Sequence, residues 1–184
     1  RAELIAFGNN RGKLAALNAA VEQARGKYFI ILDADDWLST HYASRCIDEL
    51  RRCREKDESI GFVYSDCNLM GADGAYLDRG RSTPFDKDLV GKLSFLPEPA
   101  LTLTEAIRQA GPFDERIRKA TKHHKWVRIV TRGWYGRYIN EPLFYYRMHT
   151  DNMSGIGKRV AAENRNGDRG ERILSGYWQV SNDR

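Results

Sequence analysis

Three carboxylates that follow a short hydrophobic segment are the side chains best placed to do chemistry. Asp33, Asp35 and Asp36 come directly after residues 28–32, which read YFIIL. Carboxylates this close repel one another unless a cation or a proton lies among them. Residues two apart in an extended chain point the same way, so Asp33 and Asp35 can face one ligand, and their oxygens suit a divalent cation, Mg²⁺ or Mn²⁺. The spacing therefore predicts a metal-dependent site for a phosphate-bearing ligand.

The same acids have a simpler interpretation, a solvated turn that caps the next helix, and a D-x-D pattern alone is frequent. The hydrophobic run before them shows no alternation, which is typical of a strand buried on both faces of a sheet. In open α/β sheets, ligands bind at the carboxyl ends of such strands. This placement favours the functional interpretation.

The surrounding segments predict an α/β domain. Glu3–Phe7 is apolar enough for a strand, Lys13–Arg25 carries apolar residues at helical spacing, and the YFIIL strand follows, so the three segments form a βαβ unit. We expect a mostly parallel central sheet flanked by helices. Further helices are predicted at about 40–54, 103–110 and 118–131, and strands at 60–67, 75–77 and on both sides of 141–142, with a surface loop at 80–92.

Composition and charge place the chain among globular proteins of a reducing compartment. Its 184 residues are 41% hydrophobic and 30% charged, and no apolar run approaches the ~20 residues of a membrane span. The three cysteines lack the paired spacing of a zinc site, which favours free thiols. We expect a cytoplasmic protein, and the start at Arg1 without Met suggests a piece of something longer.

A basic stretch at 116–137 contains eight Lys and Arg residues and no acid, against a net charge of +5 for the whole chain. It can be a solvated helix face, or it can attract an anionic acceptor or the acidic inner face of a membrane, with the protein bound there peripherally. Strand propensity explains the nearby aromatic residues, so we expect no nucleic-acid partner.

Several motifs in one order resemble family 2 glycosyltransferases of GT-A fold. Residues 10–38, with an N-x-G turn, an Ala-rich helix, a hydrophobic strand and D-A-D-D, resemble the centre of that family's domain. Downstream, SIGFVYSD, AGPFDERI, KWVRIVTRG and EPLFYYRMHTDNMS resemble its later elements. The resemblance implies that residues 1–150 are a partial GT-A domain. Residues 151–184 remain as a polar tail with a terminal helix as one option.

The resemblance also implies an activity. The intact protein would transfer a sugar from a nucleotide-diphosphate donor to a hydroxyl of a carbohydrate or lipid-linked acceptor, with metal assistance and inversion, in the synthesis of a cell-envelope polysaccharide. Carried over by position, it assigns Asp33, Asp35 and His149 to the metal, Gly12, Lys13 and Asp33 to the donor, and Asp114 and Glu115 to catalysis beside the acceptor.

One position departs from the family pattern. The family's acidic general base precedes the Arg of its L-W-L-R helix by six residues, and here that position holds Lys122, which cannot accept a proton while it is charged. Three explanations stay open: His123 or His124 replaces the base, Asp114 or Glu115 does so, or the domain is a catalytically impaired remnant. A D-x-D phosphatase is a further alternative, although the Thr its motif requires is replaced here by Trp37.

Overall fold

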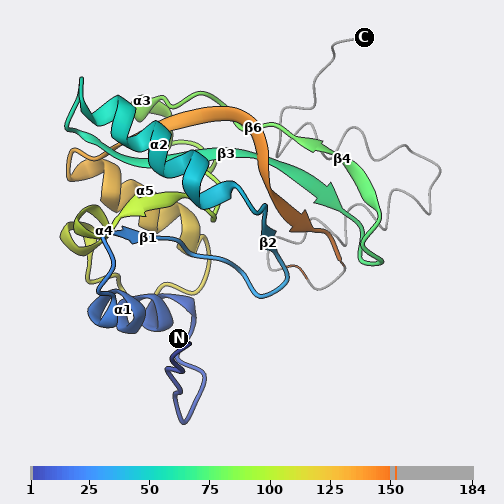
Figure 1. Cartoon of the computed structure of the whole chain (residues 1–184). Helices are drawn as coiled ribbons and strands as arrows, with labels where there is room; N and C mark the ends of the chain where they lie inside the picture. The colour runs from blue at the N-terminus through green and yellow to red at the C-terminus, as the bar shows by residue number, and fades with distance from the viewer. Residues whose placement is uncertain (1, 150–151, 153–184) are drawn as a thin grey trace.

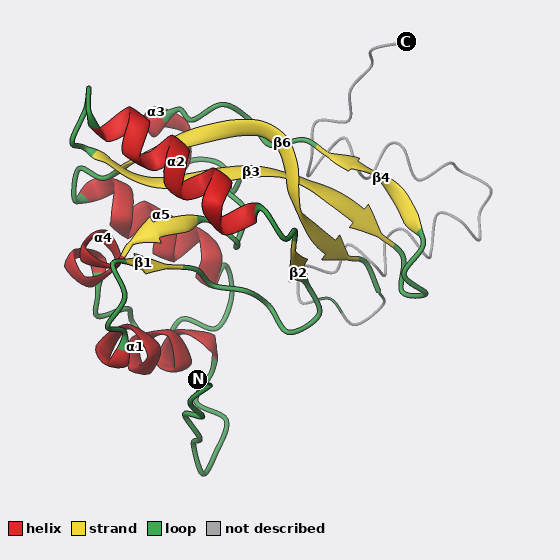
Figure 2. Ribbon diagram, viewed as in Figure 1, coloured by secondary structure: helices red, strands yellow, loops and turns green. Residues whose placement is uncertain are grey.

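The computed structural model describes residues 2–149 and 152, which form a curled sheet with helices on both faces (Figures 1 and 2). The polar tail predicted for 151–184 and its terminal helix lie outside the described residues, apart from Asn152. The helices are α1 (Lys13–Gln23), α2 (Tyr42–Arg54), α3 (Lys87–Val90), α4 (Thr104–Ala110) and α5 (Thr121–Thr131). The strands are β1 (Tyr28–Phe29), β2 (Trp37–Leu38), β3 (Ile60–Met70), β4 (Tyr76–Gly80), β5 (Leu101–Leu103) and β6 (Tyr135–Arg147).

The sheet is partly parallel, whereas a mostly parallel sheet was expected. Its strand order is β1-β5-β3-β6-β2, and β4 pairs with β3 beside this path. The long pair β3–β6 is parallel, and the other described pairs are antiparallel. The tight turn at Asp73-Gly74 joins β3 directly to β4, and a short hairpin connection can only make an antiparallel pair. The α/β class and the helices flanking the sheet are confirmed.

The strand predicted at Glu3–Phe7 is wrong, and with it the βαβ unit. Residues 2–7 have no regular structure, and the side chain of Leu4 is 90% exposed. No described strand lies beside this segment to take up its backbone hydrogen bonds, and an isolated strand is not stable in water. Regular pairing in the YFIIL segment is likewise limited to Tyr28 and Phe29, which pair with β5.

Strand β6 crosses Glu141-Pro142, where two separate strands were predicted. Pro142 lies opposite Asp66, and the register of the β3–β6 pair shifts on both sides of Asp66. Proline is tolerated in a sheet at such an irregularity because the missing N–H falls where the ladder is already interrupted. The uninterrupted strand carries its last residue, Arg147, to the segment that holds the three acids.

The core lies on both faces of the sheet, and β3 contributes to each. Successive side chains of a strand point to opposite faces. Val63 and Leu69 therefore pack in the cluster with α2, whereas Phe62 and Tyr64 pack in the cluster with α1, α4 and α5. Burial on both faces explains why the first half of β3, residues 60–64 (IGFVY), lacks polar alternation. Among the described helices, none is both long and apolar enough to cross a membrane.

Candidate functional site

The three acids after β1 have three different partners. The chain turns at Ala34-Asp35, so the extended spacing that would point Asp33 and Asp35 at one ligand is absent. Asp33 Oδ1 accepts a hydrogen bond from Lys13 Nζ at 2.6 Å, and Asp35 Oδ2 lies 2.9 Å from His149 Nε2. Asp36 accepts the backbone N–H of Arg147 at 3.0 Å. The structure thus brings Asp35 and His149 together and places Asp33 with Lys13 instead.

Asp35 and His149 are the pair that could hold a metal ion. Within 2–149 and 152, no third His, Cys, Asp or Glu joins them to form a larger ligand group. One carboxylate and one imidazole suit an Mn²⁺ or Mg²⁺ ion that takes its remaining ligands from phosphates and water. The donor set fits such an ion, with Asp33 outside it.

Asn152 supports this pair and was missed by the sequence analysis. Its side-chain Nδ2 lies 3.3 Å from Asp35 Oδ2 and donates to Arg147 O at 3.1 Å, while its Oδ1 accepts the backbone N–H of His149 at 2.7 Å. Asn152 is buried. Asn three residues after His in the H-T-D-N segment indicates a side-chain-stabilised turn, which is the signal that could have identified it.

Asp36 and Trp37 fasten the acidic segment to the end of β6. Burial raises the pKa of Asp36 to about 7, and the neighbouring carboxylates of Asp35 and Asp33 add to the rise, against the opposing effect of the Arg147 N–H. The Trp37 ring stacks on Tyr145 with centroids 5.0 Å apart. These contacts fix the backbone that directly follows Asp35.

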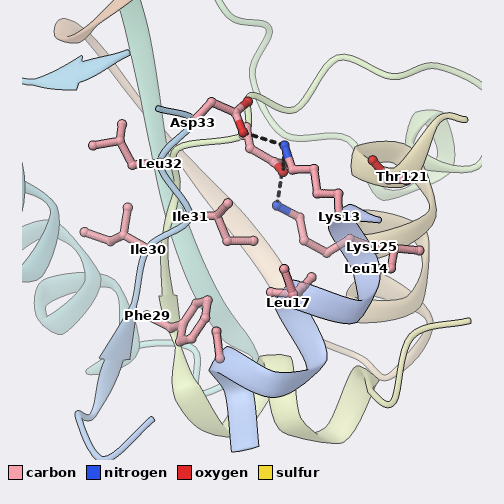
Figure 3. A pocket seen from close by; sticks show the side chains of 13 residues that line it. Lys13, Leu14, Leu17, Phe29, Ile30, Ile31, Leu32, Asp33, Thr121 and Lys125 are labelled. Carbon is pink, nitrogen blue, oxygen red and sulfur yellow. Dashed lines mark hydrogen bonds and ion pairs between the residues drawn. The ribbon is translucent and has the colours of Figure 1, made fainter. Parts of the chain in front are cut away.

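Lys13 lies between two carboxylates. Its Nζ is 2.6 Å from Asp33 Oδ1 and 2.7 Å from Glu98 Oε1, and Glu98 Oε2 in turn accepts from Lys125 Nζ at 2.7 Å (Figure 3). Glu98 and Lys125 were not singled out from the sequence. The residues around them border a cavity of about 310 Å³ between α1 and the segment after β1. Its walls are mostly apolar, and the charged groups lie together at one end.

Gly12 begins α1 with a backbone that favours glycine. Its φ is +88°, and a Cβ there would meet the end of the Arg118 side chain, whose guanidinium donates to the carbonyl of Arg11. The Gly12 N–H donates to Asn10 Oδ1 at 2.8 Å. Glycine therefore suits this left-handed position, which directly precedes Lys13 at the N-terminus of α1.

Asp114 and Glu115 are both held by arginines. Asp114 pairs with Arg116 at 2.8 Å, and Glu115 pairs with Arg11 at 2.7 Å. Hydrogen bonds from Arg116 hold the pKa of Asp114 well below its ordinary value, and those from Arg11 lower the pKa of Glu115. A carboxylate with a depressed pKa is a weak base. Neither residue contacts Asp35 or His149.

Asn18 ties the loop that carries these two acids to α1. Its side chain exchanges hydrogen bonds with the backbone N–H and C=O of Phe113, each at 2.9 Å, and also contacts Glu115 at 3.3 Å. Asn18 is the late Asn of the helix motif seen in the sequence.

Lys122 lies in the first turn of α5 and is half-buried. Burial lowers the pKa of Lys122, although the Glu98 carboxylate opposes the effect. Burial also lowers the pKa of His124, whose ring packs edge-on against Phe113 at 6.2 Å. The position that departs from the family pattern thus lies beside the buried cluster of Lys13, Glu98 and Lys125.

Comparisons with known proteins show what the chain is similar to. Residues 1–71 match the model of the family described as Glycosyl transferase family 2. The chain is 26% identical over 155 residues to a hyaluronan synthase of Pasteurella multocida, covering 82% of this chain and 15% of that protein. It is 27% identical over 158 residues to a protein of Bacillus subtilis named as a teichuronic acid biosynthesis glycosyltransferase, TuaG, covering 84% of this chain and 60% of that one.

A solved structure has the same fold. The crystal structure of residues 1–349 of S. aureus TarS in complex with UDP superposes with a TM-score of 0.51 at 15% sequence identity, covering 92% of this chain and 51% of that one. The chain spans less than two thirds of the length of each of these three proteins. The motif order and the fold agree with this match, which covers residues 1–71 of the chain.

Proposed function

We propose that the intact protein transfers a sugar from a nucleotide-diphosphate donor to an acceptor hydroxyl during synthesis of a cell-envelope polysaccharide. The observation that carries this proposal is the contact between Asp35 and His149, 2.9 Å apart although they come from opposite ends of the domain. The family match and the relatives named for hyaluronan and teichuronic acid support sugar transfer as the activity.

Each part of the site has a role in this reaction. Asp35 and His149 would hold a divalent cation, Mn²⁺ or Mg²⁺, whose charge offsets the negative charge that develops on the departing diphosphate. Lys13, Asp33 and Gly12 would bind the nucleotide part of the donor. Asp36 orients the metal-binding turn through its hydrogen bond with Arg147.

The proposed transfer inverts the anomeric centre. A base takes the proton of the acceptor hydroxyl, the oxygen attacks the anomeric carbon, and the bond to the diphosphate breaks on the opposite side. Asp114 and Glu115 are the carboxylates proposed for the proton transfer, and each has to leave its arginine partner before it can accept a proton.

Metal removal tests the proposal on the intact protein. We expect transfer from a UDP-sugar to stop in excess chelator and to return with Mn²⁺. We expect Asp35→Ala to abolish metal-dependent transfer, because Asp35 would be a direct ligand, and loss of a residue that only supports a ligand already costs roughly 10–100-fold. Asp88→Asn serves as the control, because Asp88 is an exposed acid on α3 that pairs with the neighbouring Lys87. Full activity with chelator present would overturn the metal role.

A second candidate function is nucleotide-sugar binding without transfer, favoured by Lys122 at the position of the family's base and by the ion pairs of Asp114 and Glu115. Calorimetric titration of UDP together with a turnover assay separates the two functions. If the protein binds UDP but releases no UDP from any donor, it binds nucleotide sugars without transfer, and the transfer function is excluded.

A further inference from the structure

Four charged side chains of alternating sign form a row of ion pairs across one end of the cavity. Lys125 on α5 contacts Glu98, Glu98 contacts Lys13 on α1, and Lys13 contacts Asp33 after β1, with oxygen–nitrogen distances of 2.7, 2.7 and 2.6 Å. In Figure 3, the side chains of Lys13, Asp33 and Lys125 come from three different segments and point toward one another. This row of ion pairs links α5 to the acidic segment.

Glu98 and Lys125, the inner two residues of this row of ion pairs, are buried. Glu98 is 8% exposed and Lys125 is 2% exposed. The Lys125 ammonium lies 4.1 Å from the centroid of the Trp126 ring, and Trp126 Nε1 donates to Pro97 O at 3.0 Å, which fixes the residue next to Glu98. Buried ions cost several kcal/mol each unless they are paired and hydrogen-bonded. Because Glu98 and Lys125 are buried and paired, the fold holds both side chains in defined positions.

The electrostatics keep the central groups charged. Burial alone raises the pKa of Glu98, but the ammonium groups of Lys125 and Lys13 outweigh it and bring that pKa below its ordinary value. Burial alone lowers the pKa of Lys13, and here the carboxylates of Glu98 and Asp33 outweigh it and raise the pKa. Glu98 is thus an anion and Lys13 a cation at neutral pH, and each restrains the other.

We propose that Glu98 is a positioning residue of the donor site, which holds the Lys13 ammonium against Asp33 while Lys125 holds Glu98. This inference rests on the proposed function for its donor. Asp33 Oδ1 is occupied by Lys13, and the Asp33 side chain is still 40% exposed, so the carboxylate is restrained but accessible to a hydroxyl of a bound nucleotide. Without Glu98, Lys13 has one anchor instead of two, and Asp33 is less well ordered.

The test replaces the buried pair in the intact protein by apolar residues, Glu98→Leu with Lys125→Met. Exchange of a buried ion pair for apolar side chains of similar volume is often neutral for stability, whereas loss of one partner alone is not. Glu49→Gln is the matched control, because Glu49 is also a buried carboxylate with two cationic partners, here Arg52 and Arg137. It lies at the opposite end of β6 from Asp36.

Two measurements test the two parts of the proposal, the restraint of Lys13 and the binding of the donor. Labelling of Lys13 with an amine-reactive reagent, followed by mass spectrometry, reports on its restraint and needs no nucleotide. We expect the labelling rate in the double variant to rise roughly tenfold or more, the factor expected for loss of a charge-assisted hydrogen bond. We expect the Kd for UDP and the KM for the donor to rise by a similar factor, with kcat within a few-fold of the parent and the control unchanged in all three.

The outcomes separate this inference from the proposed function. Unchanged labelling of Lys13 in the folded double variant would overturn the role of Glu98, whatever the nucleotide does. Faster labelling with unchanged UDP binding would overturn its role at the donor site. Failure of the parent protein to bind UDP would overturn the proposed function and the donor role together, while the labelling data would still report whether Glu98 restrains Lys13.

Discussion

Asp33 and Asp35 are two residues apart and have different partners. Asp35 contacts an imidazole and an amide, His149 and Asn152, whereas Asp33 contacts an ammonium, Lys13. A carboxylate whose oxygen is already bound to a cation offers less to a metal ion. The turn at Ala34-Asp35 produces this division, because it directs the two side chains to different neighbours.

Replacement of Asp33 should therefore weaken donor binding without changing the response to metal. In Asp33→Asn we expect the KM for the sugar donor to rise by roughly tenfold, the factor for loss of one charge-assisted hydrogen bond. The Mn²⁺ concentration that gives half-maximal activity should stay within twofold of the parent. A large shift of that concentration would instead make Asp33 a metal ligand.

Asp114 is the carboxylate whose catalytic role can be tested most directly. If it accepts the proton of the acceptor, Asp114→Asn lowers kcat by 10²- to 10⁴-fold, the usual contribution of a general base, and leaves UDP binding unchanged. We expect the lower part of this range, since Arg116 depresses the pKa of Asp114 and makes it a weak base. Arg116→Gln is the companion variant, and unchanged turnover in Asp114→Asn would exclude Asp114 as the base.

The sequence motifs predicted part of the candidate site. The rest was missed because its residues lie far apart in the sequence. Asp35 and His149 were found because each lies in a recognisable motif, and the structure places them in contact. Glu98 lies in a proline-rich segment without helical or strand periodicity, and its partners come from α1 and α5. Only the tertiary fold shows that a glutamate there has two lysines beside it.

At the scale of elements, helices were easier to predict than strands. Regular apolar spacing located α1, α2, α4 and α5 within a few residues. Strands β2 and β5 have two and three residues, too few to show a period, and exist because β6 and β3 supply their hydrogen bonds. The 13-residue β6 was read as two strands because proline usually ends a strand, and the register shift opposite Pro142 removes that restriction.

Helix α5 joins the core to the charged cluster, and Trp126 is its main anchor. The Trp126 ring is 2% exposed, packs against Phe62 with centroids 4.6 Å apart, and donates to Pro97 O. We expect Trp126→Ala to lower the free energy of unfolding by about 3–5 kcal/mol, the usual cost of removing a buried aromatic side chain. Thr131→Ala, at an exposed position of the same helix, should change it by less than about 0.5 kcal/mol in denaturant titrations. Equal effects of the two variants would contradict this placement of α5.

For the molecule as a whole, much of the basic stretch at 116–137 is used internally. Arg116, Lys125 and Arg137 pair with carboxylates, and Arg118 and Arg128 donate to backbone carbonyls. These contacts weaken the interpretation in which the stretch attracts an anionic partner, because a cation held by a neighbour contributes less to the field that steers such a partner. Lys119 and Arg132 are exposed, and such a partner would also meet the exposed side chains of Arg116, Arg118 and Arg137.

Glu49 connects α2 to β6 and should make the stability of the whole domain depend on pH. Hydrogen bonds from Arg52, and further ones from Cys53 and Arg137, outweigh burial and lower the pKa of Glu49 to about 2, from an ordinary value of 4.5. A carboxylate with a depressed folded-state pKa stabilises the fold above its unfolded-state pKa, and this contribution is lost as the pH falls through the folded-state value. We therefore expect Glu49→Gln to lower the free energy of unfolding at pH 7 by on the order of 1–3 kcal/mol.

The difference between Glu49→Gln and the parent protein should shrink as the pH falls from about 4.5 to about 2, because the parent's Glu49 becomes neutral over that interval. Urea titrations at several pH values measure it, with Glu141→Gln as the control, since Glu141 pairs with Arg45 at an exposed position and contributes little. A Glu49→Gln difference that stayed constant down to pH 2 would mean that packing of the side chain, and not its charge, holds α2 to the start of β6.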